Sequence, residues 1–351
     1  MTPEEMNKLV ELSNSSPATS DAPPPLWTYS SPASRDGSTY SGVSIGASPY
    51  AALKTTTNIP VVIVPLIVTV AGVTLDPTAV VTDSCVRPDW NGKTPVQVLL
   101  QSPILTATDW TMNGQNIGNG QYLDAFRRAD YWSLVRDSSY HTVLSPITVA
   151  DAQTVPPSAI DPDATTATSA CVAGVGGAPD QITLGHVDSG LLTPWLEGTL
   201  IPRLRAQGVI SSGQLVYFLF YNTTFSDALG FHSYVGNQTY AASFINGSDC
   251  CYPDVKTISH VLGDWMNDPI PTANQNLTPG WVAQTDGAGN PSLCQNIVAV
   301  GDPSADRLFP DVTMPNGITY HPQELTFHSW FLGAPSMGAG KIGRASCRER
   351  V

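Results

Sequence analysis

Runs of apolar residues rich in β-branched side chains mark four segments as buried strands. The longest, residues 59–75, has the sequence IPVVIVPLIVTVAGVTL, and residues 96–101, 215–221 and 239–245 have a similar character. The longest run is short for a membrane span and contains Pro60 and Pro65, so its Val and Ile residues favour one or two strands of a core sheet. The pattern predicts a strand-rich N-terminal part and no transmembrane span.

Helical periodicity appears in three further places. Apolar residues three and four positions apart form one amphipathic stripe over residues 122–132 and a second over 192–204, which Pro202 should kink or split. A third helix begins near Asp254, which we expect to be its N-cap, and ends at the Asp-Pro pair of residues 268–269. Strands followed by helices predict an α+β fold with a helix-containing C-terminal part.

We expect one domain over residues 26–341, although 351 residues would also suffice for two. Residues 1–25 include a stretch rich in Ser, Pro and Ala and are expected to form a flexible leader. Residues 342–351, IGRASCRERV, match the translation of a string that resembles a common sequencing adapter. We therefore expect this tail to be non-native and the natural chain to be truncated after Lys341.

The first 16 residues contain acidic side chains and no apolar run that could serve as the core of a signal peptide. We expect that the native start is missing or miscalled, and that it carries a signal peptide for the extracellular space or the cell envelope (periplasm). An ordinary disordered N-terminus of a cytoplasmic protein is the alternative.

The chain is acidic, with 16 Lys and Arg residues against 29 Asp and Glu and a net charge of −13. So sparse a basic content provides no stripe that could neutralise a phosphate backbone, and we expect no nucleic acid partner. Charged residues are only 13% of the chain. This low fraction, together with abundant Thr, Ser and Asn, is typical of proteins that work outside the cytoplasm.

On the third predicted helix, His260 and Asp264 stand four residues apart, so their side chains project from one face about one turn from each other. The apolar residues Ile258, Leu262 and Trp265 fall on a different face. Two ligands at this spacing can share a metal ion. The same spacing also suits a solvent-facing pair of a protonated histidine and a carboxylate, and the spacing alone leaves both alternatives open.

The run SHVLGDWMNDP, residues 259–269, resembles the Ser-His-Glu-x-x-Glu-Trp-x-x-Asp-Pro segment of a group of largely uncharacterised exported bacterial proteins with a zincin-like helix. The similarity extends over most of the chain. It includes residues 83–85, 112–132 (MNGQNIGNGQYLDAFRRADYW), 215–222 (LVYFLFYN), 300–303 (VGDP) and 312–325 (VTMPNGITYHPQEL). The resemblance implies a zincin-like α+β domain related to zinc metallopeptidases.

In zincins the first and fifth positions of this motif bind Zn²⁺, and a Glu at the second position is the general base. The resemblance therefore implies that His260 and Asp264 are metal ligands, and it places Val261 at the general-base position. An isopropyl group cannot accept a proton, and loss of a general base typically slows a reaction by about 10² to 10⁴. Ala299 stands where the group has a Glu that would be a candidate third ligand.

A third ligand is expected from the downstream chain, and a loop hydrogen bond or a surface charge is the alternative for each candidate. The candidates are Asp302, His321, Glu324 and His328. Asp268 and Glu324 are candidates to replace the missing base through a water molecule. His141, His186 and His232 have no neighbouring pattern and are interpreted as structural.

The natural cysteines are Cys85, Cys171, Cys250, Cys251 and Cys294. They contain no Cys-x-x-Cys pair, which argues against a structural zinc site of four cysteines. In an exported protein Cys250 or Cys251 would pair with Cys294, and Cys85 with Cys171, although the sequence does not determine the connectivity. In the cytoplasm all five would stay reduced.

Two functions follow from these observations. The first is an exported zincin-like metallopeptidase relative that acts on a peptide or protein substrate and is impaired in catalysis. It would be a pseudoenzyme unless another residue serves as the base, or unless Val261 and Ala299 are sequence errors. The alternative is a noncatalytic envelope or extracellular protein with a binding or structural role, for which we expect an exposed aromatic patch with Trp281 and Trp330. The sequence does not determine the oligomeric state.

Overall fold

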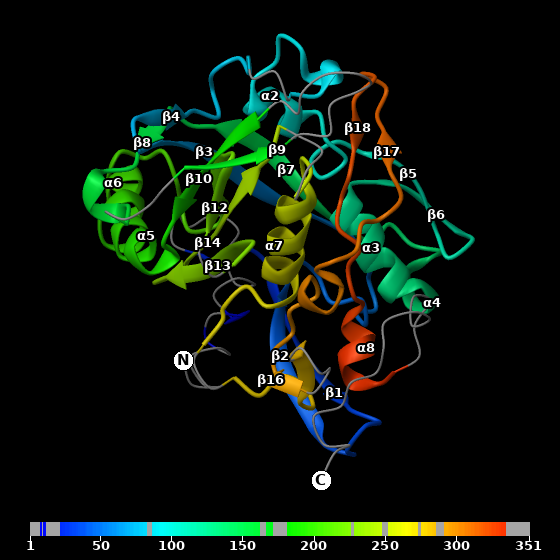
Figure 1. The fold of residues 1–351 in the computed structure, drawn as a ribbon. Coiled ribbons are helices and arrows are strands. Elements are labelled where there is room, and N and C mark those ends of the chain that lie inside the picture. Colours follow the sequence, from blue (N-terminus) through cyan, green and yellow to red (C-terminus); the bar gives the residue numbers. More distant parts are fainter. Residues whose placement is uncertain are drawn as a thin grey trace.

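The longest apolar run forms the central strand of a mixed sheet (Figure 1). The computed structural model describes residues 8, 10–11, 22–82, 86–161, 166–170, 181–225, 228–247, 252–272, 275–285 and 291–334. The sheet has the strand order β13-β14-β11-β3-β4, and β7 and β8 also pair with β3. Its members are β3 (Thr56–Val70), β4 (Val73–Leu75), β7 (His141–Val149), β8 (Gln153–Thr154), β11 (Leu215–Tyr221), β13 (Gly230–Val235) and β14 (Gln238–Ile245).

Strand β3 pairs in parallel with β7, β8 and β11, and β11 pairs in parallel with β14. Strand β13, at one end of the order, runs antiparallel to β14. These strands confirm the predictions for residues 59–75, 215–221 and 239–245. Their apolar runs are nearly continuous because both faces of the sheet are covered, which is usual for parallel strands.

Side chains of alternate residues enter two separate cores, one on each face of the sheet. In β11, Tyr217 and Leu219 pack in the core that contains α7 and α3, whereas Phe218 and Phe220 pack in the core that contains α5 and α6. Figure 1 shows α7 near the centre of the molecule, with α5 and α6 on the opposite side of the sheet. The period of two along a strand therefore decides which residues can reach α7.

Smaller sheets surround the central one. The antiparallel pairs are β1 (Leu26–Pro32) with β2 (Thr39–Ile45), β5 (Thr108–Met112) with β6 (Gln115–Gly120), β15 (Trp281–Thr285) with β16 (Pro291–Gln295), and β17 (Val312–Thr313) with β18 (Thr319–Tyr320). Strand β10 (Gln181–Val187) lies between β9 (Ala167–Ala170) and β12 (Thr223–Phe225).

The helices confirm the α+β class. They are α2 (Pro95–Leu100), α3 (Tyr122–Asp130), α4 (Trp132–Val135), α5 (Ser189–Trp195), α6 (Ile201–Ala206), α7 (Lys256–Asn267) and α8 (His328–Leu332), with the π-helix η3 (Leu196–Leu200) between α5 and α6 and the 3₁₀ turns η1 (Pro88–Trp90), η2 (Pro157–Ala159) and η4 (Asp302–Ser304). Among the described residues, no helix has both the length and the apolarity that crossing a bilayer requires.

The second predicted stripe, over residues 192–204, spans α5, η3 and α6, and its leucines are buried. The expected split is present, because the helical path changes to a π-helical turn before Pro202. Pro202 itself lies in the first turn of α6, where a missing N–H costs little.

Two predictions about local structure are wrong. Residues 96–101 lie mostly in helix α2, because Thr94 and Gln97 form a capping box and Pro95 occupies the first turn. Asp254 is not the N-cap of α7, since Val255 holds that position without a side-chain cap. The Asp254 carboxylate instead contacts Arg87 and His321. The predictions for residues 342–351 and for most of the leader lie outside the described residues.

Candidate metal centre

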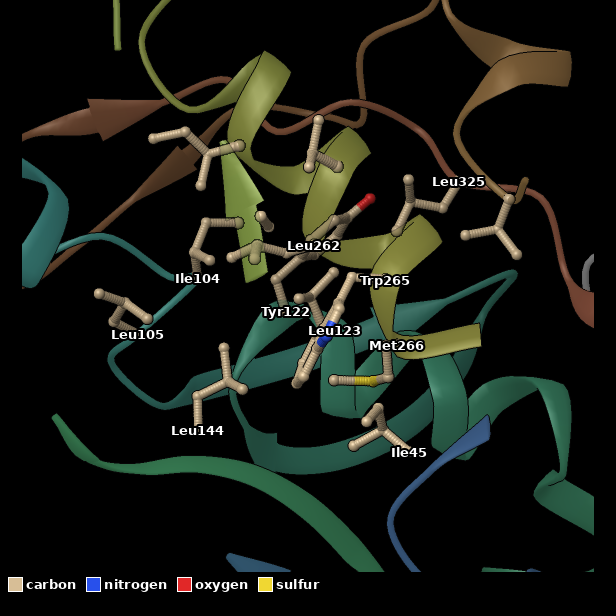
Figure 2. Close-up of a cluster of buried hydrophobic side chains, with 14 of the residues drawn as sticks. Ile45, Ile104, Leu105, Tyr122, Leu123, Leu144, Leu262, Trp265, Met266 and Leu325 are labelled. Atoms are coloured by element: carbon tan, nitrogen blue, oxygen red, sulfur yellow. The ribbon is translucent and has the colours of Figure 1, made fainter. Parts of the chain in front are cut away.

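The packing face of α7 fixes the direction of the opposite face. Leu262, Trp265 and Met266 pack against Tyr122 and Leu123 of α3 in the core on one face of the sheet (Figure 2). Trp265 is fully buried, and the helix also contacts β13 and β14. Because residues of an α-helix repeat every 3.6 positions, this packing directs His260 and Asp264 away from α3.

Three side chains converge on that second face. His260 Nε2 lies 3.2 Å from Asp264 Oδ2 and 3.3 Å from Asp302 Oδ1. One donor atom from each residue lies within 4.8 Å of the others. His260 and Asp264 are buried, whereas Asp302, in η4, has a side chain that is 33% exposed. The fold therefore brings Asp302, one of the four downstream candidates, to His260 and Asp264 of α7.

Gln323 orients the His260 ring. The Gln323 side-chain amide donates to the carbonyl oxygen of Gly301 at 2.6 Å, and its Oε1 faces His260 Nδ1 at 3.1 Å. An amide oxygen can only accept a hydrogen bond, so Nδ1 donates its proton to Oε1, and Nε2 is the ring atom that faces the two carboxylates. The Gln323 backbone N–H donates to Ser259 Oγ at 2.8 Å, which ties this residue to α7.

Gly301 contacts both Asp264 and the ring of His260. Its backbone N–H donates to Asp264 Oδ1 at 2.7 Å, which leaves Oδ2 for His260. A Cβ atom on Gly301 would lie 2.6 Å from His260 Nδ1, far inside contact distance. The imidazole therefore packs flat against a position where only glycine leaves room.

The electrostatics favour a positive charge between the two carboxylates. Burial by itself would lower the pKa of His260, but the carboxylates of Asp264 and Asp302 outweigh it and raise the pKa to about 10. A divalent cation would replace the proton on Nε2, because proton and metal compete for the same lone pair.

The three side chains line a pocket of about 700 Å³. The resemblance would place a glutamate at position 299. In this structure Ala299 lines the same pocket as His260, Asp264 and Asp302.

His232 also lines this pocket, although the sequence analysis interpreted it as structural. It lies on β13, where Phe231 and Val235 pack in the core with α5 and α6, and His232 points to the face with α7 because side chains alternate along a strand. Its Nδ1 is buried and has no hydrogen-bond partner among the described residues. Burial lowers the pKa of His232 to about 4. The alternation within β13 was the sequence signal that could have identified it.

The other downstream candidates have different partners. His321 Nδ1 lies 2.6 Å from Asp254 Oδ2, in a network that also includes Arg87. His328 is buried against the Tyr29 ring, 4.5 Å between centroids, and burial lowers its pKa to about 4. Glu324 is not among the described residues that line the pocket. The structure does not bring these three side chains to the His260 group.

The positions expected to supply a base are set apart from the pocket. Val261 is 1% exposed in the hydrophobic core, close to Gly230 of β13. Asp268 is buried at the C-terminal end of α7, where the Gln275 amide donates to it at 3.3 Å. Burial, followed by the charge of Asp264, raises the pKa of Asp268 to about 7. Neither Asp268 nor Val261 lines the pocket among the described residues.

The remaining sequence predictions concern aromatic residues and cysteines. Trp281 is fully buried and Trp330 is 8% exposed, with their rings in an edge contact, so they do not form an exposed aromatic patch. Cys294 lies on β16. The other four cysteines of the predicted disulfides lie outside the described residues, and the disulfide pairing stays a prediction.

Comparison with protein families, with curated proteins and with solved structures finds no match to this chain. A functional assignment therefore depends on the geometry of this pocket and on the local resemblance of its helix.

Proposed function

We propose that this protein binds a divalent metal ion, with zinc the expected ion, through His260, Asp264 and Asp302. We further propose that it is an exported relative of zincin-like metallopeptidases with impaired catalysis. The donor set of one imidazole and two carboxylates suits zinc, and the same atoms would also accept neighbouring first-row metals such as manganese or cobalt.

One observation carries the proposal. In a tetrahedral zinc site with bonds of about 2.0 to 2.1 Å, neighbouring donor atoms lie about 3.3 Å apart. The distances from His260 Nε2 to the two carboxylate oxygens are 3.2 and 3.3 Å. Two of the distances between donor atoms thus match a tetrahedral zinc site, and the same distances also suit a protonated His260 between the two carboxylates, so metal loading has to separate these states.

The surrounding contacts support the same assignment. Metal-binding histidines usually donate their other ring N–H to a fixed acceptor, and Gln323 supplies this acceptor to His260. Asp264 is held in turn by the Gly301 N–H. These contacts orient both ligands before any metal binds, and preorganised ligands increase metal affinity.

The proposal of impaired catalysis depends on Val261. When zinc is bound it would supply Lewis acidity to a substrate carbonyl. This chain has no carboxylate at the usual general-base position, and Asp268 and Glu324 do not line the pocket among the described residues. We therefore expect slow but measurable peptide hydrolysis.

The experiment that tests the metal site is elemental analysis of the purified full chain after loading with zinc and removal of unbound metal. About one zinc per chain is expected, with a clear loss in Asp302→Ala. Asp306→Ala is the matched control, because Asp306 is an exposed aspartate just after the same 3₁₀ turn and does not line the pocket. A folded wild-type chain that retains no zinc or other divalent metal would refute the proposal.

A noncatalytic binding protein is the second candidate, and the buried Val261 is the observation that favours it. Both candidates retain the metal site, so hydrolysis separates them. A zinc-loaded chain that cleaves a mixed peptide library excludes the noncatalytic role, whereas stoichiometric zinc without cleavage supports it.

A further inference from the structure

The segment that follows β18 is attached at two points to the start of α7. The backbone N–H of His321 donates to Asp254 Oδ1 at 2.9 Å, and the backbone N–H of Gln323 donates to Ser259 Oγ at 2.8 Å. Asp254 precedes α7, and Ser259 lies in its first turn. The two attachments therefore hold residues 321–323 beside the part of the helix that leads to His260.

Pro322 joins these two points with little slack. The proline ring fixes its φ at about −65°, so a displacement of His321 is passed on to Gln323 instead of being absorbed between them. The carbonyl oxygen of Gln323 has a further anchor, because it accepts from the Tyr122 hydroxyl at 2.6 Å. Loss of the attachment at His321 would therefore shift the Gln323 side chain without releasing it.

The His321 side chain strengthens the first attachment. Its Nδ1 lies 2.6 Å from Asp254 Oδ2, and Nδ1 donates because a carboxylate can only accept. Asp254 is fully buried and also accepts from Arg87 Nη1 at 2.8 Å. Arg87 donates in turn to the carbonyl oxygen of Thr319 at 2.6 Å. A buried ion pair and an imidazole thus fix the end of β18 against the residues before α7.

Asp254 is held in a backbone conformation that residues other than glycine rarely adopt. Its φ is +25°. Strain of this kind persists only where the surrounding contacts determine the conformation, and it clusters at functional sites. Asp254 and His321 are not among the described residues that line the pocket. Their contacts would therefore affect the pocket through the segment that they hold.

We propose that Asp254 and His321 are positioning residues of the metal site, which set Gln323 against His260 and so raise zinc affinity without contacting the metal. The proposal rests on the metal site described above. Loss of a residue that contacts a metal ligand typically lowers metal affinity by about 10- to 100-fold. His321 acts one residue further away, and Gln323 keeps its other anchors, so we expect about a three- to tenfold loss without His321.

Competition of the full chain with a chromophoric chelator for zinc tests the proposal. His321→Ala should bind zinc about three- to tenfold more weakly than the wild type, and Gln323→Ala about 10- to 100-fold more weakly. The double variant should bind zinc no more weakly than Gln323→Ala alone, because His321 acts through the Gln323 side chain. Such non-additivity is the signature of two residues that act in series.

His141→Ala is the matched control. His141 Nδ1 lies 2.7 Å from Oδ2 of the fully buried Asp124, and its side chain is 27% exposed, against 18% for His321. This pair joins β7 to α3, and neither residue is among the described residues that line the pocket. His141→Ala should therefore lose stability in urea much as His321→Ala does and keep the zinc affinity of the wild type.

Two further variants separate positioning from a general loss of stability. His321→Asn keeps an N–H close to the place of Nδ1 and should restore most of the zinc affinity. His321→Gln places its amide closer to Nε2 and should bind zinc as weakly as His321→Ala. Urea unfolding of the metal-free chains shows which variants are folded, and the comparison of Asn with Gln decides the matter if His321→Ala is not.

Zinc binding by the wild-type chain separates this proposal from the metal site itself. A folded wild-type chain that binds no zinc refutes both. A wild-type chain that binds zinc, together with His321 variants of unchanged affinity or with fully additive effects of His321→Ala and Gln323→Ala, overturns the positioning role and leaves the metal site intact.

Discussion

The contact between Gly301 and the His260 ring leads to a sharp prediction for Gly301→Ala. The backbone at Gly301 has φ −78° and ψ −35°, a conformation that alanine adopts without strain. The added Cβ would lie 2.6 Å from Nδ1, 2.7 Å from Cγ and 2.9 Å from Cε1 of His260. Any loss of stability or of metal affinity must therefore come from this steric contact.

The size of the effect follows from the distances. An ordinary contact needs about 3.4 Å or more, so the ring or the Gly301 loop must move by about 0.8 Å. The Gln323 contact is 3.1 Å long and sits near the upper limit of a hydrogen bond, and metal sites tolerate only about 0.2 Å. We expect zinc affinity to fall by about 10- to 100-fold and the free energy of unfolding to drop by about 1 to 3 kcal/mol.

Competition titration with a chromophoric chelator measures the affinity, and urea unfolding of the metal-free chain measures the stability. Gly198→Ala is the matched control, because Gly198 is exposed in η3 and a Cβ there meets nothing within 4 Å. Glycine to alanine at such a position normally stabilises a protein by about 0.4 to 1 kcal/mol. If Gly301→Ala gained stability as Gly198→Ala does and bound zinc with wild-type affinity, the geometry described for His260 would be refuted.

Three further outcomes are expected. Ala299→Glu adds a carboxylate to the pocket and should raise zinc affinity at least tenfold in the same chelator titration. Ala299→Gln, which adds an amide of the same size, should not. Equal zinc affinities of the two variants would contradict the placement of this residue. Val261→Glu would place an unpaired carboxylate in the hydrophobic core, where Val261 is 1% exposed, and should lower the free energy of unfolding in urea by about 3 kcal/mol or more without raising hydrolysis of a fluorogenic peptide. Stability equal to that of Val261→Leu, or faster hydrolysis, would contradict the buried position of this residue. Burial, followed by the charge of Arg127, lowers the pKa of His328 to about 4, so the unfolded chain, with a histidine pKa of about 6.5, binds the extra proton. Stability is then full above pH 6.5 and falls as the pH drops toward 4, by about 2 kcal/mol at pH 5. His328→Gln should remove this loss from urea unfolding curves at pH 7 and 5, and an unchanged pH dependence would contradict it.

Local patterns predicted the elements whose burial is uniform along their length. The runs at residues 59–75 and 215–221 form strands because both faces of the sheet are buried, so most of their positions carry an apolar side chain. Residues 96–101 have a comparable apolar run and lie mostly in a helix. There the decisive residues were Thr94 and Gln97, whose capping box stabilises a helix start and precedes the run itself.

The sequence by itself determined the α+β class, the helix that carries His260 and Asp264, and the pairing of these two side chains on one face, since helical geometry alone sets a spacing of four residues. Only the tertiary structure decided which downstream residue joins them. Asp302 approaches within 3.3 Å of His260, whereas His321 is held by Asp254. His232, which precedes α7 in the chain, enters the same pocket through β13. These side chains are distant in the sequence and meet because β13, α7 and the 3₁₀ turn η4 pack together. The spacing of residues within any one of these elements does not determine that packing.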